Sequence, residues 1–346
     1  MRYHRQTLLP QIGQAGQDRL SSSRVLLVGC GALGSTIADQ LVRAGVGFLR
    51  LADRDVVEET NLQRQTLFDE ADAREQVPKA IAAAKRLGAV NSSVKLDSRV
   101  VDVHAGNIEE LAGCIEGRPV QLIVDGTDNA QTRYLINDVA VKHAVPWIYG
   151  ACVGVEGRVM MLRPPDGACL RCIFPQPPAP GELATCDTSG VLGPAAVVVG
   201  ALQAAQAIRF LTDPSDKEIE RLIWLDAWSG RFRSSSIASA KREDCIACGK
   251  RVFEFLDAGD RGGLTSLCGR NAVQVRPSQA VRIDLKSLAV KLSASGSTQQ
   301  TPHLVRCHLP PPQDLNLTIF PDGRMIVQNT EDLDRARSVY ARWIGT

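Results

Sequence analysis

The sequence lacks a strong excess of either charge. Its 40 lysines and arginines face 38 aspartates and glutamates, for a formal net charge of +2. Nucleic acids and anionic membranes attract basic surfaces, so this balance gives no reason to expect either as a partner. The 44% apolar and 23% charged content is typical of a globular protein, and 346 residues allow one large domain plus a smaller one.

The chain also lacks segments typical of export or membrane insertion. The first residues, MRYHRQTLLPQIG, contain no apolar core like that of a secretory signal. The longest apolar run, Val191 to Ile208, is interrupted by one proline and two glutamines, which favours a buried helix over a membrane span. We therefore expect a cytoplasmic protein whose ten cysteines serve as thiols, for metal binding or chemistry.

The most informative stretch is a short apolar run followed by a glycine-rich turn. Residues 25–28 have the character of a buried parallel strand, and residues 35–43 can form a helix. Between them lie three glycines with the spacing G-x-G-x-x-G: Gly29, Gly31 and Gly34. Glycine permits the tight turn, and a helix N-terminus presents free N–H groups to a phosphate. The stretch therefore predicts a nucleotide-binding β-α-β unit.

Polar residues follow the second strand of this unit. The strand, over 48–52, ends at Asp53, about twenty positions after the glycines, where a ribose hydroxyl is usually held. This pattern alone does not distinguish NAD from ATP. The polar segment that begins at Asp55 follows a strand end, where open α/β sheets place their ligands. Three of its side chains could share one face of a helical turn: Asn61, Arg64 and Gln65.

A lysine lies at the start of a predicted helix. Pro78 opens a strong helix over 79–90, which places Lys79 in its first turn. A cation is unfavourable there unless an anion lies close by. The position therefore predicts a nearby anion.

Two carboxylates follow a later buried strand, 121–125. Asp125 ends this strand and Asp128 lies just beyond, an arrangement of oxygen ligands that suits Mg²⁺. Alternatively, Asp128 or Asn129 caps the next helix, 130–143. The local sequence leaves both alternatives open.

Two C-x-x-C pairs predict a metal site. Cys169 with Cys172 and Cys245 with Cys248 can together hold one ion in a tetrahedral four-thiolate site. With all four positions filled by protein, the expected Zn²⁺ would be structural and not catalytic. The alternative is a redox dithiol or incidental cysteines.

A single thiol lies in the proline-rich linker between the two pairs. Cys186 precedes a glycine- and alanine-rich helix, and a thiol near a helix N-terminus can have a lowered pKa and act as a nucleophile. The alternative is that it is a small buried apolar side chain, the usual role of a free cysteine.

Taken in chain order over roughly residues 1–250, these motifs resemble the ThiF/MoeB/HesA family, relatives of the ubiquitin-activating enzymes. The resemblance implies a homodimer that uses ATP and Mg²⁺ to adenylate a small ubiquitin-like protein at its C-terminal Gly-Gly. In bacteria that partner is a sulfur carrier for thiamin or molybdopterin synthesis. A cysteine desulfurase or another sulfur donor would then be a further partner.

The resemblance also implies roles for individual residues. Asp53 would hold the ribose of ATP, Asp128 would bind Mg²⁺, and Arg5 would reach the triphosphate from the neighbouring subunit. The phosphates would contact Asn61, Arg64 and Lys79. The rest of the expected nucleotide site is Asp55, Gln65, Asp125 and Asn129. Cys186 matches a position that takes the carrier covalently in some relatives, whereas others function without that step.

The sequence departs from the family just before Lys79. Gln76-Val77 stands where the family usually has glycine and a basic residue. Because Lys79 itself is kept, we expect activity to survive.

We therefore expect an α/β fold: a Rossmann-like mixed, mostly parallel sheet with helices on both faces and a four-cysteine zinc site over 1–250. Residues 251–346 predict a small α+β domain, with strands over 271–276 and 304–308, a hairpin over 315–328 turned at Pro321-Asp-Gly323, and helices over 283–294 and 332–344. This tail lacks a C-x-x-x-x-x-R loop and a Gly-Gly end, so we expect neither a rhodanese-type sulfur transferase nor a fused carrier. It would help to hold the carrier, or it would only stabilise the fold.

Several other functions compete with carrier activation. The chain could be a ThiF-like adenylase of a peptide or tRNA-linked carboxylate, or a non-catalytic scaffold partner. A dinucleotide-dependent oxidoreductase would need a hydride-transfer site that the sequence does not show. A scaffold has no need of four convergent charged groups, Arg5, Arg64, Lys79 and Asp128. The pathway that the carrier serves (thiamin, molybdopterin, cysteine or tRNA thiolation) is not determined by the sequence.

Overall fold

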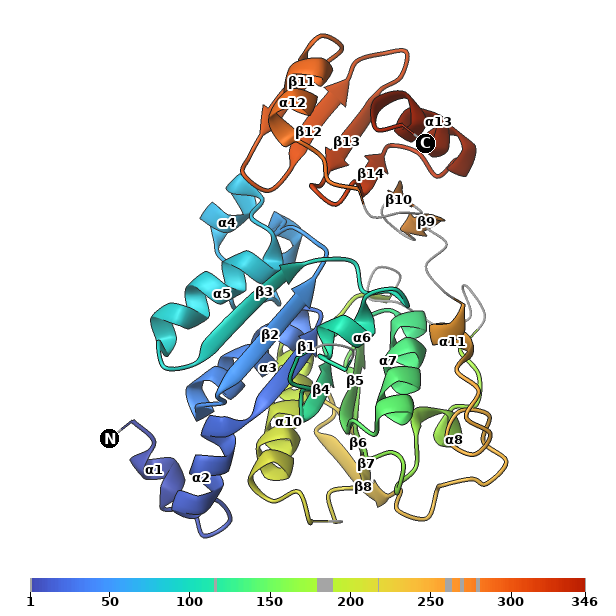
Figure 1. Ribbon diagram of the computed structural model, residues 1–346. Helices are drawn as coiled ribbons and strands as arrows, with labels where there is room; N and C mark the ends of the chain where they lie inside the picture. Colours follow the sequence, from blue (N-terminus) through green and yellow to red (C-terminus); the bar gives the residue numbers. More distant parts are fainter. Residues whose placement is uncertain are drawn as a thin grey trace. The chain divides into compact units, whose positions relative to one another are not determined.

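The chain divides into two compact units. The computed structural model describes residues 2–114, 117–178, 189–216, 218–258, 263–267, 271–277 and 281–345. The units are Met1–Gly259 and Asp260–Thr346 (Figure 1). Cys186, which the sequence singled out as a thiol of interest, lies outside the described residues.

The first unit is built on an eight-stranded sheet with the order β3-β2-β1-β4-β5-β6-β7-β8. The strands are β1 Arg24–Val28, β2 Phe48–Asp53, β3 Lys95–Val100, β4 Leu122–Asp125, β5 Trp147–Val153, β6 Glu156–Leu162, β7 Arg221–Asp226 and β8 Arg231–Ser236. Strands β1 to β5 pair in parallel, whereas β6, β7 and β8 are added in antiparallel fashion. The predicted mixed, mostly parallel sheet is thus confirmed.

Helices cover both faces of this sheet because its central strands are apolar on both sides. Along β1, Val25 and Leu27 pack into one core cluster, and Leu26 and Val28 pack into the other. The first face is covered by α2 Gly13–Ser22, α3 Ala32–Ala44, α5 Lys79–Val90 and α10 Gly193–Thr212, and the second by α6 Ile108–Leu111 and α7 Ala130–His143 (Figure 1).

Helix α10 contains the longest apolar run of the sequence. By length and composition it could cross a membrane, but 56% of its most apolar 18-residue window is buried within the fold. It packs against α3, β5 and β6, where Val199 and Ala204 are fully buried. Its apolar character therefore serves the core of the first unit.

Predicted and observed element boundaries agree best where capping or proline signals were strong. Helices α5 and α7 span the predicted 79–90 and 130–143. The helix predicted from residue 35 begins earlier, at Ala32. Helix α6, Ile108–Leu111, is a single turn. The sequence did not predict β7 and β8.

The second unit is a six-stranded antiparallel sheet with two helices. Its strand order is β11-β12-β13-β14-β10-β9. The elements are β9 Gly263–Leu267, β10 Ala272–Arg276, α12 Leu285–Ser293, β11 Ser297–Gln300, β12 Val305–Leu309, β13 Leu315–Ile319, β14 Met325–Gln328 and α13 Leu333–Trp343. The predicted hairpin is formed by β13 and β14. On α13, Ala336, Tyr340 and Trp343 are buried, whereas Leu333 is 43% exposed.

The first unit depends on a close backbone approach at three glycines. A Cβ added to Gly34 would lie 2.0 Å from the carbonyl oxygen of Gly29, and one added to Gly126 would lie 2.5 Å from the same atom. Gly29 itself has φ +91°, a conformation that side chains disfavour. The loop after β1, the start of α3 and the loop after β4 therefore meet with no room for side chains.

We expect Gly34→Ala to lower the free energy of unfolding by about 1–3 kcal/mol, because the added methyl group forces α3 away from the loop. The matched control is Gly88→Ala in α5, where the nearest atom to an added Cβ is 4.0 Å away. That change should stabilise the protein by about 0.5–1 kcal/mol through helix propensity. Denaturant unfolding measures both; equal effects of the two substitutions would contradict the close approach.

Candidate functional site

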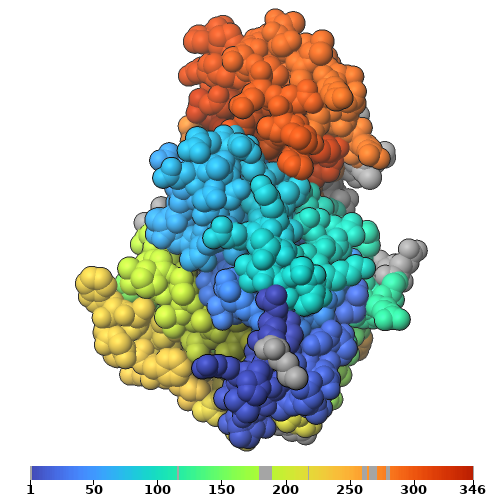
Figure 2. Space-filling model, turned by 90° about the vertical axis from the view of Figure 1, so that its left-hand side faces the viewer, coloured from blue at the N-terminus to red at the C-terminus, as the bar shows by residue number. Residues whose placement is uncertain are grey.

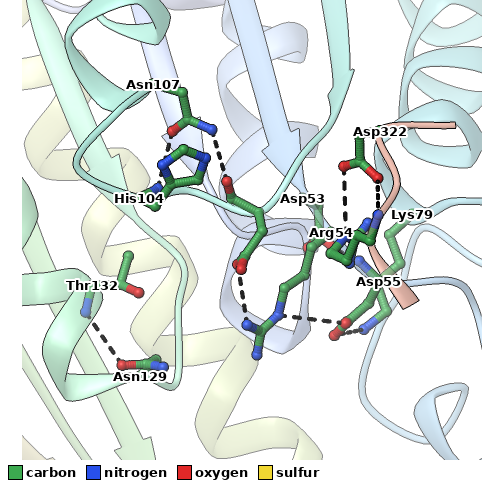
Figure 3. Close-up of polar contacts among 11 residues, drawn as sticks. Asp53, Arg54, Asp55, Lys79, His104, Asn107, Asn129, Thr132 and Asp322 are labelled. Carbon is green, nitrogen blue, oxygen red and sulfur yellow. Dashed lines mark hydrogen bonds and ion pairs between the residues drawn. The ribbon is translucent and has the colours of Figure 1, made fainter. Parts of the chain in front are cut away.

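The loops that carry the predicted residues meet at one edge of the large sheet. β1 lies between β2 and β4, so the strand order changes direction there. In open α/β sheets the ligand crevice lies at this point, beyond the carboxyl ends of the strands. The loops after β1, β2 and β4 bring the glycines, the segment from Asp53 and the segment from Asp125 to this edge (Figure 3).

Asp53 connects the end of β2 to the glycine loop. Its Oδ2 accepts a hydrogen bond from the N–H of Cys30 at 2.6 Å, and its Oδ1 accepts one from the N–H of Asp55 at 2.7 Å. Burial raises the pKa of Asp53, and the cation of Lys79 partly offsets that effect. A carboxylate has about four hydrogen-bond acceptor sites. Asp53 can therefore position the loop and still accept a hydrogen bond from a ribose hydroxyl.

The start of α3 faces open space. Gly31 is the N-cap residue, and no side chain caps the free N–H groups of the first turn. The nearest atom to a Cβ built on Gly31 is the Nε2 of Gln65, at 3.8 Å. Gln65 is 4% exposed, and its buried Oε1 accepts no hydrogen bond from any residue that the structure describes. Uncapped donors and an unsatisfied acceptor thus lie beside the same opening.

The segment after Asp55 forms the predicted helical turn. The turn begins as the 3₁₀ helix η1, Glu59–Asn61. The carbonyl of Asn61 accepts hydrogen bonds from the N–H groups of Arg64 and Gln65, at 3.1 and 3.0 Å. Its side-chain Oδ1 accepts one from the N–H of Glu58 at 3.2 Å. Asn61 is buried, and its hydrogen bonds stabilise the turn. Arg64, in the same turn, is partly exposed.

The anion that the position of Lys79 predicted is Asp55. Lys79 is 4% exposed, and its Nζ lies 3.4 Å from Asp55 Oδ2 (Figure 3). Arg54 lies on the other side, with Nε 3.7 Å from Asp55 Oδ1 and Nη1 3.1 Å from Asp102 Oδ1. Burial lowers the pKa of Arg54, but Asp55 and Asp102 outweigh it and raise the pKa overall. Arg54 carries no local sequence signal, because its partner Asp102 comes from a different loop.

The polar residues of the segment after β4 differ in burial and in hydrogen bonding. Asp125 is fully buried; its Oδ1 accepts hydrogen bonds from the N–H and Oγ1 of Thr127, and its Oδ2 accepts one from Arg133 Nε at 3.0 Å. Asn129 is the N-cap of α7, where it accepts a hydrogen bond from Thr132 N–H at 3.2 Å. Asp128 is exposed at the crevice edge.

The capping alternative is confirmed for Asn129, which is the N-cap of α7. Both carboxylate oxygens of Asp125 accept hydrogen bonds within the fold. Asp128 remains as the carboxylate that is accessible to a cation. Sequence reasoning missed Arg133, although a cation in the first turn of α7 is the same signal that pointed to Lys79.

Arg5 lies at the opposite end of the first unit from this crevice. It is exposed in α1, His4–Thr7. The neighbouring Gln6 donates a hydrogen bond to the carbonyl of Ala44, at the end of α3, and Asn91, just after α5, donates one to Tyr3. Helices α3 and α5 begin at the crevice, and the 12 residues of α5 span roughly 18 Å. Arg5 is therefore not part of its own chain's crevice.

The four C-x-x-C cysteines come together as predicted. Their Sγ atoms all lie within 4.8 Å of one another, with separations of 3.6 Å for Cys169–Cys245 and 3.4 Å for Cys172–Cys248. A tetrahedral zinc with Zn–S bonds of about 2.3 Å requires S–S separations of about 3.8 Å. Hydrogen bonding, chiefly with Cys169, lowers the pKa of Cys172 to about 4. The cluster is compatible with a four-thiolate zinc site.

The departure from the family before Lys79 has a local structural consequence. Gln76 follows α4, Glu70–Glu75, in the left-handed conformation with φ +49° that glycine adopts more easily. Val77 packs partly buried against the first core cluster. The N–H of Lys79 still donates to the carbonyl of Asp55 at 2.9 Å. Lys79 thus keeps its anchor despite the departure.

Comparisons with known proteins agree with this geometry. The ThiF family model matches residues 3–247. The chain is 41% identical to the "Sulfur carrier protein ThiS adenylyltransferase" of Bacillus subtilis, with 99% of each chain covered. It is 40% identical to the "Sulfur carrier protein adenylyltransferase" of Thermus thermophilus, with 72% of this chain and 90% of that protein covered.

A solved structure supports the fold alone. The crystal structure of Escherichia coli MccB with ATP superposes with a TM-score of 0.61 at 21% identity, and the match covers 72% of this chain and 75% of that one. Family model, relatives and fold lead to the same conclusion: this chain belongs to the ThiF family.

Proposed function

We propose that this chain is an adenylyltransferase that uses ATP to join AMP to the C-terminal carboxylate of a small sulfur carrier protein of the ThiS type, and releases pyrophosphate. The observation that carries the proposal is Lys79: a 4% exposed cation at a helix start, held by Asp55 beside Asp53 and the glycine loop. The Bacillus relative, which is named for this activity, matches over 99% of both chains.

The chemistry requires charge neutralisation and needs no general base. A C-terminal carboxylate has a pKa of about 3.5 and is ionised at neutral pH. Its oxygen attacks the α-phosphorus of ATP while the bond to the β-phosphate oxygen breaks, so two anions must approach each other. Lys79, Arg64 and the uncapped N–H groups of α3 supply positive charge at the crevice. This requirement explains a site without a serine, histidine and aspartate arrangement.

Magnesium would be held by Asp128 and the phosphates. The ion commonly uses one or two carboxylates, with water and substrate phosphates as its other ligands. Asp128 is exposed, whereas both oxygens of Asp125 are bound within the fold. The residues present therefore fit a one-carboxylate site. When bound, Mg²⁺ neutralises phosphate charge.

The active enzyme is proposed to be a homodimer that works in the cytoplasm. Arg5 lies away from its own crevice and would reach the triphosphate of the neighbouring subunit. Large apolar side chains are exposed just after α1, on α10 and on the β7–β8 hairpin: Leu8, Leu9, Val198, Trp228 and Phe232. Figure 2 shows these segments on one face, with the deep blue N-terminal helices beside yellow-green α10 and the gold hairpin. An exposed apolar face of this kind is typical of a protein interface.

The two parts of the chain are proposed to have different roles. Residues 1–250 form the adenylation domain, and residues 251–346 help to hold the carrier. The Thermus relative covers 72% of this chain but 90% of its own length, which supports a tail that is dispensable for the basic chemistry. Cys186 would take the activated carrier covalently, with a cysteine desulfurase or another donor supplying sulfur.

Lys79→Ala should reduce ATP–pyrophosphate exchange by at least about a hundredfold, because no other cation occupies the buried start of α5. Exchange with labelled pyrophosphate and a ThiS-type carrier measures the loss. Lys85→Ala is the matched control, since Lys85 is exposed on the same helix. Equal activity of both variants would exclude Lys79 from phosphate binding.

Mixing two inactive variants tests whether Arg5 acts across a dimer. Arg5→Ala and Lys79→Ala are each expected to be inactive, but after subunit exchange half of the dimers are mixed and have one intact site. Exchange activity should then recover to about one quarter of the wild-type value. Persistent inactivity of the mixture, with mixed dimers shown by native mass spectrometry, would mean that Arg5 serves no neighbouring site.

Purified protein should contain one zinc per chain, held by the four clustered thiolates. Cys248→Ser should lose the metal and lower the melting temperature by several degrees, because the site connects α8, Leu170–Ile173, to the segment around Cys245. The control is Cys114→Ser, which lies outside the cluster. Metal analysis and thermal unfolding measure both effects. Unchanged stability in zinc-free Cys248→Ser would argue against a structural role.

A further inference from the structure

Asp55 bridges two cations, one on each carboxylate oxygen. Lys79 Nζ lies 3.4 Å from Oδ2, and Arg54 Nε lies 3.7 Å from Oδ1 (Figure 3). The exposed fractions of these side chains are 5% for Lys79, 25% for Asp55 and 27% for Arg54. Because the three groups are largely withdrawn from solvent, the charge of each one changes the energy of the others.

This arrangement creates a competition for Lys79. While Lys79 is paired with Asp55, it is not available to another anion. If it turns toward the phosphates of ATP, Asp55 loses the counterion at its Oδ2. Burial of a carboxylate without a counterion is unfavourable, so Asp55 opposes the move unless another cation neutralises it. Arg54 is already in contact with the other oxygen of that carboxylate.

Arg54 is also fixed from a second side. Its Nη1 lies 3.1 Å from Asp102 Oδ1, in the loop between β3 and α6. The carbonyl of Asp102 accepts a hydrogen bond from Asn107 Nδ2 at 2.8 Å, so the loop that anchors Arg54 is itself fastened. The guanidinium is thus held beside Asp55 independently of where the Lys79 side chain lies.

We propose that Arg54 is a positioning residue: it neutralises Asp55 and so allows Lys79 to leave that carboxylate for the phosphates of ATP. The inference rests on the proposed function, in which Lys79 contacts the phosphates. Arg54 acts through Lys79 and need not touch ATP or the carrier. Without Arg54, the negative charge of Asp55 is less neutralised, so its ion pair with Lys79 is stronger. ATP must then compete with this stronger ion pair for Lys79.

The test compares Arg54→Gln in two backgrounds of the full-length protein, with Asp55 and with Asp55→Asn. ATP affinity is measured by calorimetry, and the KM for ATP and kcat by pyrophosphate exchange with a ThiS-type carrier. With Asp55 present, Arg54→Gln should raise both the Kd and the KM for ATP about tenfold, with a smaller effect on kcat. Arg54→Lys should restore most of the affinity. In the Asp55→Asn background, Arg54→Gln should cause no further loss.

Two outcomes would overturn the proposal. An equal loss of ATP affinity in both backgrounds would mean that Arg54 does not act through Asp55. Unchanged Kd and KM for ATP in Arg54→Gln, with Asp55 present, would mean that Lys79 reaches the phosphates without a second cation at that carboxylate. Melting temperatures show whether each variant is folded. Failure of the wild-type protein to bind ATP and to exchange pyrophosphate would instead contradict the proposed function itself.

Discussion

The rest of the site depends on the close approach of two backbones at Gly29 and Gly126. The carbonyl oxygen of Gly29 lies so near to Gly34 and Gly126 that no Cβ fits at either position. This contact sets the start of α3 and the loop after β4 at fixed positions beside the crevice. Asp53 then ties the same loop to β2 through the N–H of Cys30. Cations and hydrogen-bond donors for an anionic ligand are placed on this rigid base.

Charge within the crevice is paired before any ligand arrives. Lys79 is held by Asp55, Arg54 by Asp55 and Asp102, and Arg133 by Asp125. A buried lysine without an anion would be strongly destabilising, so the resting fold supplies carboxylates as temporary partners. In the proposed function Lys79 exchanges Asp55 for the phosphates of ATP, while Arg54 stays beside that carboxylate. The carboxylate that pairs with each cation therefore matters for ligand binding as much as the cation does.

The sequence predicted the fold and the cysteine cluster where a local signal existed. Three local motifs predicted three observed features. The glycine spacing predicted the β-α-β unit, the proline before Lys79 predicted the start of helix α5, and the paired C-x-x-C motifs predicted the cysteine cluster. Asp125 and Asp128 were indistinguishable by sequence, since only tertiary packing makes one buried and the other exposed. Arg54 gave no signal because its partners, Asp55 and Asp102, are brought together by the pairing of β2 with β3. The edge strand β8 carries no sequence signal because it is wholly exposed and has no apolar alternation.

The central claim is that the crevice transfers AMP to a free C-terminal carboxylate of a carrier. The most direct measurement is the intact mass of a ThiS-type carrier after incubation with ATP, Mg²⁺ and this protein. The carrier should gain one adenylyl group, and a carrier with an amidated C-terminus should gain none. An absence of adenylylated carrier with the free carboxylate, or equal labelling of the amidated carrier, would contradict the account.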